Sequence, residues 1–253
     1  MTLTRLTESR VSLCGPAGNL SVAAFASDGA FIAPPPPAAR FLEFVGDSIS
    51  AGDLNDGAGA DGSAPQFCGN IAINDDITKT SGARLCLPPP TGFGADCSFT
   101  AWGGITLSEM AGGALPLYES TFSGAGPRGG SYGAWNFSAA RRADAVIINL
   151  GTNDHPSAPA TNWMATYAAF VKRAASLYAA PPAFFLAYGP MSVGYEPFVK
   201  NVTAALVAAG VNAFALDLSL PHPLTGCFGH PSAADNVEIA AKARPQVAAA
   251  LGW

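Results

Sequence analysis

Charged side chains are scarce in this sequence. Of its 253 residues only 12% are Asp, Glu, Lys or Arg, against 49% hydrophobic residues, and the 18 acidic and 13 basic side chains leave a formal net charge of −5. Nucleic acids and anionic membrane surfaces bind proteins mainly through basic patches. We therefore expect neither as a partner, and we expect a neutral substrate instead.

Long apolar runs are also lacking. None approaches the roughly 20 residues that cross a bilayer, and residues 1–5 contain no secretory signal. Three Asn-x-Ser/Thr acceptor sequences, at Asn19, Asn136 and Asn201, nevertheless permit glycosylation in a secretory pathway. Together with the five cysteines, they favour a secreted, extracellular protein whose signal peptide is not part of this sequence.

The cysteines do not form a metal-binding pattern. There is no Cys-x-x-Cys pair and no Cys/His cluster at zinc spacing, so we expect no metal and no other cofactor. Cys68, Cys86 and Cys97 share one loop-rich stretch, and proximity favours a bond from Cys68 to Cys86 or Cys97. Cys14 and Cys227 lie far away in the sequence, and the odd count leaves at least one thiol free or paired outside the chain. The connectivity, like the oligomeric state, stays open.

A run of four prolines at residues 34–37 divides the chain. Proline fits neither the interior of a sheet nor that of a helix, so the run is a stiff connector. Before it, residues 10–13 and 20–25 are predicted as short strands, which are too few for a core of their own. We expect residues 1–37 to be the tail of an N-terminal β-domain with its linker, and residues 38–253 to form the main domain.

After the connector, apolar strand patterns alternate with helical ones. The run at 143–150 is almost continuously apolar, as a strand buried on both faces requires. The stretch 53–97 is polar and rich in Gly, Pro and Cys, which indicates a long loop stapled by disulfides. The alternation predicts an α/β fold with a doubly wound, parallel five-stranded sheet in a three-layer, flavodoxin-like arrangement. The predicted strands cover 41–45, 98–102, 143–150, 183–188 and 212–216, and the predicted helices 106–111, 162–178, 196–209 and 233–251.

Four short motifs fall at one rim of the predicted sheet. Ligands of such sheets bind outside the carboxyl ends of the strands. Gly46-Asp47-Ser48 follows the first strand, Gly103-Gly104 the second and Gly151-Thr152-Asn153-Asp154 the third, while His230 precedes the last helix. Each motif alone is more often a turn or a helix cap. Together, in this order at one rim, they predict an active site.

Ser48 is the predicted nucleophile of that site. A serine hydroxyl is a weak nucleophile at its own pKa and needs an adjacent base, which His230 can supply by accepting the proton and returning it to the leaving group. The backbone N–H groups of Ser48 and Gly104 and the side-chain amide of Asn153 are the predicted donors to the oxyanion.

Two other histidines compete with His230 for the role of base. His155 directly follows the Gly151–Asp154 motif and would share the side of the site that Asn153 occupies, so it ranks second and is better suited to line the pocket. His222 lies between two prolines and is expected in a surface loop.

In this order, the motifs resemble the four motif blocks of the SGNH/GDSL hydrolases, over about residues 38–253. More narrowly, the chain is similar to carbohydrate esterase family 2, whose members deacetylate xylan and related glycans. Residues 41–52, 149–154 and 226–232 carry this similarity. The resemblance implies the same nucleophile, base and oxyanion donors, and it implies that residues 1–33 end a β-sandwich most of which this chain would lack.

The chain departs from the family pattern beside the histidine. SGNH enzymes carry an Asp three residues before it, and here that residue is Cys227. We therefore expect a Ser–His dyad whose imidazole N–H is held by a backbone carbonyl near Cys227, with Asp217 as a weaker candidate for an orienting acid. Family 2 esterases often carry an acidic and an aromatic residue just before the histidine, where this chain has Phe228 and Gly229.

An aromatic residue elsewhere would then have to stack on a sugar. The candidates are Trp102, Trp163, Tyr195 and Phe228, although burial in the core is the commoner fate of an aromatic side chain.

Three functional hypotheses follow. The leading one is a carboxylic ester hydrolase that removes acetyl groups from carbohydrate, or from another small ester. The alternatives are a general GDSL esterase, lipase or thioesterase, and a carbohydrate-binding module with little turnover, which the missing aspartate motivates. The predicted substrate-binding residues are Asp47, Trp102, Asp154, His155 and Phe228. The sequence determines neither the sugar nor the acetylated position.

Overall fold

The computed structural model describes residues 36–56, 68, 74–107, 136–137, 140–154 and 162–253. The strands predicted at 10–13 and 20–25 lie outside these ranges, as does most of the helix predicted at 106–111. The domain boundary predicted after residue 37 therefore stays a prediction.

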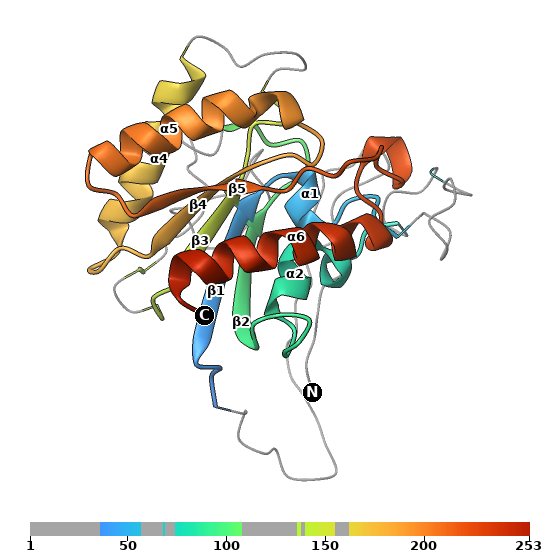
Figure 1. Ribbon diagram of the computed structural model, residues 1–253, viewed down its shortest axis with the longest axis horizontal. Coiled ribbons are helices and arrows are strands. Elements are labelled where there is room, and N and C mark those ends of the chain that lie inside the picture. Colours follow the sequence, from blue (N-terminus) through green and yellow to red (C-terminus); the bar gives the residue numbers. More distant parts are fainter. Residues whose placement is uncertain (1–35, 57–67, 69–73, 108–135, 138–139, 155–161) are drawn as a thin grey trace, which may run out of the picture.

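Five strands form one parallel sheet in the order β2-β1-β3-β4-β5 (Figure 1). Every neighbouring pair is parallel, so the predicted fold class, a doubly wound α/β sheet of five parallel strands, is confirmed. The strands are β1 (Arg40–Gly46), β2 (Ala95–Ala101), β3 (Ala145–Asn149), β4 (Ala183–Tyr188) and β5 (Ala213–Asp217).

Helices cover both faces of the sheet. In Figure 1, α4 and α5 lie together over one face, and α2 and α6 lie together over the other. The α-helices are α1 (Ser48–Ala51), α2 (Ser81–Cys86), α4 (Trp163–Leu177), α5 (Glu196–Ala208) and α6 (Ala233–Leu251), and the 3-10 turns are η2 (Ile77–Lys79), η4 (Val193–Tyr195) and η5 (Cys227–Gly229).

The central strand β3 divides the hydrophobic core into two clusters. Successive side chains of a strand point to opposite faces of its sheet. Val146 and Ile148 accordingly pack in the cluster that includes α4 and α5, whereas Ala145 and Ile147 pack in the cluster that includes α2 and α6. All five residues of β3 are buried. This burial on both faces explains the continuous apolar run of the sequence.

The strand order reverses between β1 and β3, because the chain runs from β1 outward to β2 and then returns to the other side of β1. Such a reversal opens a crevice at the carboxyl ends of the strands. Gly46, the last residue of β1, lies opposite Asn149 of β3, and the carbonyl oxygen of Gly46 accepts the backbone N–H of Trp102 at 3.1 Å. The segments that follow β1, β2 and β3 therefore begin side by side.

Two disulfides correct the pairing that proximity favoured. Cys68 is bonded to Cys227, which is 159 residues further along the chain, and Cys86 is bonded to Cys97. The expectation that Cys68 pairs with Cys86 or Cys97 is therefore wrong, because Cys68 is bonded to the segment before α6. Cys14 lies outside the described residues.

Two kinds of feature are absent from the described residues. No helix among them is long and apolar enough to cross a membrane. Nor does this part of the chain bring together three or more His, Cys, Asp or Glu side chains in an arrangement that would hold a metal ion.

Candidate active site

The turn after β1 presents Ser48 at the start of α1. The side chain of Asp47 caps this short helix, because its Oδ1 accepts the backbone N–H of Ile49 at 3.0 Å. Gly46 makes the tight turn feasible, since a Cβ there would lie 2.1 Å from Ser50 Oγ and 3.0 Å from the carbonyl oxygen of Asn149. The turn thus holds Ser48 at the carboxyl end of the central strands, where the sequence pattern predicted it.

His230 meets Ser48 from the opposite end of the sequence. Its Nε2 lies 3.0 Å from Ser48 Oγ, and its Nδ1 lies 3.2 Å from the carbonyl oxygen of Cys227. A carbonyl oxygen can only accept a hydrogen bond, so the proton of a neutral imidazole lies on Nδ1 and the lone pair of Nε2 faces the serine hydroxyl. This is the tautomer that a general base for Ser48 requires.

The loop that carries His230 is anchored to the segment after α1. The backbone N–H of Cys227 donates to the carbonyl oxygen of Leu54 at 3.3 Å, and the N–H of Ala233 donates to the carbonyl oxygen of Asn55 at 2.8 Å. Leu54 has a positive φ of 59°, an uncommon conformation for a residue with a side chain. Leu54 and Asn55 are not among the residues that the sequence predicts for the site, because no local pattern marks a backbone brace.

Asn153 lies beside the nucleophile turn. Its Nδ2 donates to the carbonyl oxygen of Ile105 at 3.0 Å and makes a long contact of 3.4 Å with Oδ2 of Asp47. Gly104, which directly precedes Ile105, has a φ of +76° that favours glycine, and nothing lies within 4 Å of the position a Cβ would take. The structure therefore brings the predicted residues Ser48, Gly104 and Asn153 to the same rim.

Asp154 ties together the loops that follow β2 and β3. Its Oδ2 accepts the backbone N–H of Leu107 at 2.8 Å, which links the loop after β3 to the loop after β2. Thr152 Oγ1 lies 3.2 Å from Ser192 Oγ, so the segment after β4 joins the same network. Asp154, predicted to bind substrate, holds a loop in this arrangement.

Burial changes the acidity of Asp47. Removal from water raises the pKa of its carboxyl to about 7, against the lowering effect of the hydrogen bonds from the Ile49 backbone and the Thr152 side chain; the charge of Asp154 raises it further. The residue directly before the nucleophile therefore titrates near neutrality.

The aromatic candidates for sugar stacking differ in how far their side chains are exposed. Trp163 and Tyr195 are buried in the core, whereas Trp102 is half-buried and Phe228 is 72% exposed. The carboxylate of Asp217 accepts from Ser219 and pairs with Lys242 at 2.9 Å.

Of the other two histidines, the structure describes only His222. His222 is exposed, with Nε2 3.1 Å from Glu238, and His155 lies outside the described residues.

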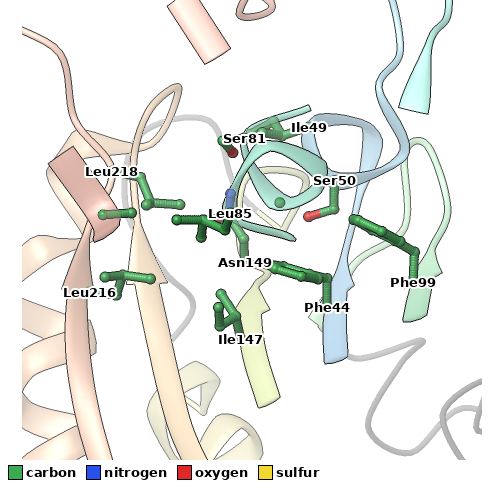
Figure 2. A pocket seen from close by; sticks show the side chains of 12 residues that line it. Phe44, Ile49, Ser50, Ser81, Leu85, Phe99, Ile147, Asn149, Leu216 and Leu218 are labelled. Carbon is green, nitrogen blue, oxygen red and sulfur yellow. The ribbon is translucent and has the colours of Figure 1, made fainter. Parts of the chain in front are cut away.

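A separate cavity lies behind α1, between the sheet and α2 (Figure 2). Ile49 and Ser50, the two residues after Ser48, line it, but Ser48 and His230 do not. Figure 2 shows Phe44 and Ile147 on its sheet side and Leu85 of α2 across from them. This cavity is mostly apolar and belongs to the interior behind the nucleophile.

The chain is similar to known carbohydrate esterases. No protein-family model matches the chain. Among curated proteins, the cellulase/esterase CelE of Acetivibrio thermocellus is 28% identical over 243 residues, which cover 89% of this chain and 27% of CelE. The chain therefore spans only about a quarter of the length of this relative.

Two solved structures share the fold over most of the chain. A carbohydrate esterase family 2 enzyme with a carbohydrate-binding domain, from Corynascus thermopiles (Myceliophthora fergusii), is 26% identical with a TM-score of 0.71, and the match covers 90% of this chain and 71% of that one. A family two carbohydrate esterase from Clostridium thermocellum, in complex with cellohexaose, is 25% identical with a TM-score of 0.71, over 90% and 69%. These comparisons confirm the predicted similarity to carbohydrate esterase family 2 and support the prediction of an ester hydrolase.

Proposed function

We propose that the chain is a serine esterase that removes acetyl groups from carbohydrate, with Ser48 and His230 as a catalytic dyad. One observation carries the proposal: Nε2 of His230 lies 3.0 Å from Ser48 Oγ while Nδ1 lies 3.2 Å from the Cys227 carbonyl oxygen. The base is thus within hydrogen-bonding reach of both the nucleophile and the orienting group, as nucleophilic catalysis requires.

The proposed reaction has two halves. The oxygen of Ser48 attacks the acetyl carbonyl carbon as His230 Nε2 takes the hydroxyl proton, and the tetrahedral intermediate collapses as that proton passes to the departing sugar hydroxyl. A water molecule, deprotonated by the same nitrogen, then attacks the carbonyl carbon of the acetyl-serine. The second tetrahedral intermediate collapses as His230 Nε2 returns the proton to Ser48 Oγ and acetate leaves. The imidazole ends each half in its starting tautomer.

Three donors are proposed to stabilise the oxyanion: the backbone N–H groups of Ser48 and Gly104, and the side-chain amide of Asn153. The amide of Asn153 has two hydrogens. One is used in the 3.0 Å bond to Ile105, and the other makes the weak 3.4 Å contact with Asp47. The second hydrogen is the one that an oxyanion would attract.

In the proposed dyad, the group that orients His230 is a neutral carbonyl, where a catalytic triad has a carboxylate. A carbonyl fixes the tautomer of His230, but it stabilises the imidazolium less than a carboxylate does, since charge-assisted hydrogen bonds are about twice as strong as neutral ones. The absence of a carboxylate at position 227 therefore agrees with an enzyme of modest turnover on an ester, which is an easier substrate than an amide.

The substrate surface favours a sugar. Phe228 lies two residues from His230 and exposes most of its ring, and an exposed aromatic ring beside a catalytic base offers a face on which a sugar ring can stack. Trp102, half-buried after β2, is a second candidate. Relatives of the same fold are carbohydrate esterases. Two disulfides also agree with work outside the cell, where acetylated xylan-like glycans occur.

Acetate release from acetylated xylan or mannan tests the proposal. Ser48→Ala and His230→Ala should abolish release to within the background. The matched controls are Ser50→Ala, two residues after the nucleophile, and His222→Ala in an exposed loop; both should keep wild-type rates. Undiminished release by either dyad variant would remove the assignment.

The acyl group is tested separately with a chain-length series of p-nitrophenyl esters. We expect kcat/KM to fall steeply beyond acetate. A preference for chains of eight or more carbons would indicate the alternative function of a lipase or general GDSL esterase, and a preference for thioesters would indicate a thioesterase.

Binding of glucan chains without turnover is a second candidate function. The relative from Clostridium thermocellum is an esterase seen in complex with cellohexaose, and the exposed ring of Phe228 supports a similar interaction here. Calorimetric titration of the Ser48→Ala variant with cellohexaose tests this candidate, with Phe228→Ala as the variant expected to lose binding. Binding unchanged by Phe228→Ala would exclude that ring as the platform.

A further inference from the structure

The disulfide between Cys68 and Cys227 lies directly behind the proposed base. The carbonyl oxygen of Cys227 accepts two hydrogen bonds from His230, one from the backbone N–H at 3.0 Å and one from imidazole Nδ1 at 3.2 Å. Two of the hydrogen bonds that hold His230 therefore end on this single peptide group.

The residues between Cys227 and His230 do little to hold that peptide. Phe228 is 72% exposed, and both Phe228 and Gly229 have positive φ values, of 52° and 75°. Cys227, by contrast, is fully buried, bonded to Cys68 through its side chain and to the carbonyl oxygen of Leu54 through its backbone N–H. Cys227 is therefore an anchor of this loop, beside the backbone hydrogen bonds from Gly226 to His230 and from Ala233 to Asn55.

We propose that the Cys68–Cys227 disulfide is a positioning element of the catalytic base, with Cys68 and Cys227 acting through the Cys227 carbonyl on His230. A carboxylate orients an imidazole by a charge-assisted hydrogen bond, which is about twice as strong as a neutral one. A neutral carbonyl makes a weaker bond, so it orients the ring only if the carbonyl itself is held in place. The disulfide supplies that rigidity where the aspartate of related hydrolases is replaced by cysteine. This inference rests on the proposed function of His230 as the base.

The double variant Cys68→Ser/Cys227→Ser tests the inference, because it removes the bond and keeps the Cys227 peptide group. Its matched control is Cys86→Ser/Cys97→Ser, which removes the other disulfide, between α2 and β2. With p-nitrophenyl acetate, we expect kcat of the test variant to fall on the order of tenfold to hundredfold, since small misplacements of a catalytic group cost that much. We expect KM to change by less than about twofold, and the control to keep both constants.

A structural signature separates positioning from general loss of stability. Nitrogen-15 spectra of the imidazole report which ring nitrogen carries the proton, and the signal of His230 is identified by its absence in His230→Ala. Wild type and control should show a single Nδ1–H tautomer for His230, whereas the test variant should show a mixture of tautomers. Wild-type kcat and an unmixed tautomer in the test variant would overturn the inference.

Chemical reduction covers the case in which the double variant does not fold. In a Cys14→Ser/Cys86→Ser/Cys97→Ser background only the Cys68–Cys227 bond remains. A water-soluble phosphine reduces it to two thiols and is itself oxidised, with water, to the phosphine oxide. We expect kcat to fall by the same factor while far-ultraviolet circular dichroism stays constant, and to recover when the thiols are reoxidised. A kcat that does not respond to reduction would contradict the inference.

The outcomes also separate this inference from the proposed function. An inactive wild type would remove the proposed function and the inference together. An active wild type with a fully active disulfide variant would remove only the role of the disulfide.

Discussion

The carboxyl of Asp47 caps α1 and also contacts the Asn153 amide, which is a proposed oxyanion donor. As pH rises and Asp47 ionises, it competes more strongly for that amide. Its carboxyl caps α1 through the N–H of Ile49 and contacts the amide of Asn153 at 3.4 Å, in a fully buried position. In its ionised form it attracts the same amide hydrogen that an oxyanion needs. In its neutral form it leaves that hydrogen freer, and burial makes the neutral form available up to about neutral pH because the pKa is raised to about 7.

Stability should therefore fall as pH rises through the range between the two pKa values of Asp47. The folded pKa of about 7 exceeds the ordinary value of 3.8, so the native state binds more protons than the unfolded state between these values. The contribution amounts to roughly 4 kcal/mol lost between about pH 4 and pH 7, from 1.36 kcal/mol for each pKa unit. Asp47→Asn keeps an oxygen for the cap and should flatten this slope. Urea unfolding between pH 4 and pH 8 measures both proteins, and equal slopes would contradict the buried-acid explanation.

Removal of the Asn153 amide tests the oxyanion assignment. Loss of one such donor typically lowers kcat by about 10²–10³-fold, and we expect Asn153→Ala to lie in that range with KM little changed. Asn212→Ala is the control, since Asn212 is exposed just before β5, at the opposite end of the sheet. A loss that appeared in KM alone would assign Asn153 to substrate binding instead.

At the scale of elements, α6 begins with a complete capping box. Ser232 Oγ accepts the backbone N–H of Asp235 at 3.1 Å, and Asp235 Oδ2 accepts the N–H of Ser232 at 2.8 Å. Both residues are buried, and α6 contributes side chains to the core cluster on its face of the sheet. The cap also fixes the point at which the chain leaves His230, two residues earlier.

Ser232→Ala should lower the free energy of unfolding by about 1 kcal/mol, within the usual 0.5–2 kcal/mol for a lost N-cap. Asn162→Ala is the matched control, because Asn162 occupies the N-cap position of α4 without a side-chain cap hydrogen bond. Denaturant unfolding measures both variants. An equal effect at the two caps would show that the hydrogen bond of Ser232 contributes nothing.

Of the elements compared here, the central strand β3 should tolerate truncation of a side chain least. Ile148 of β3 is completely buried between β1 and β4, so Ile148→Ala should cost about 2–5 kcal/mol through lost burial and a residual cavity. Val207 on α5 is 54% exposed, and Val207→Ala should stay within about 0.5 kcal/mol. Thermal unfolding separates the two, and similar values would contradict the central place of β3 in the core.

For the molecule as a whole, the elements that the sequence predicted are those with a dense local signal. Strands β3 and β4 are buried on both faces and produce continuous apolar runs. The start of α6 is marked in the sequence by its N-cap residue, Ser232. The edge strand β2 is mostly half-buried and mixes polar with apolar residues. Its prediction at 98–102 therefore begins three residues later than the observed Ala95.

Elements and bonds that depend on contacts between distant parts of the chain have no such local signal in the sequence. The stretch 53–97 was predicted as a stapled loop, yet it contains the turn η2, the helix α2 and the start of β2. Helix α2 has only six residues and depends on α6, where Asn236 Oδ1 accepts the N–H of Ser81 at 2.8 Å. The bond between Cys68 and Cys227 likewise joins positions whose relation exists only in the folded chain.

In the candidate site, too, the residues with a local sequence signal could be predicted and those held by distant contacts could not. Ser48, Asn153 and Gly104 lie in short motifs at strand ends, so the sequence could propose them together. The carbonyl partner of His230 was expected near Cys227 from the missing aspartate, and a carbonyl oxygen of Cys227 lies 3.2 Å from Nδ1. The backbone brace at Leu54 and Asn55 had no counterpart in residue type, because backbone hydrogen bonds do not depend on which side chain is present.

The sequence separation of 182 residues from Ser48 to His230 also sets the time at which the proposed activity can first appear. At synthesis rates of 5–20 residues per second, roughly 10–35 seconds separate the two residues on the ribosome. The nascent chain can pair β1 with β2 and β3 during that interval, but it holds a serine with no base. Hydrolysis of an ester therefore reports that the last loop has docked, and in refolding it should recover after the helical signal rather than with it.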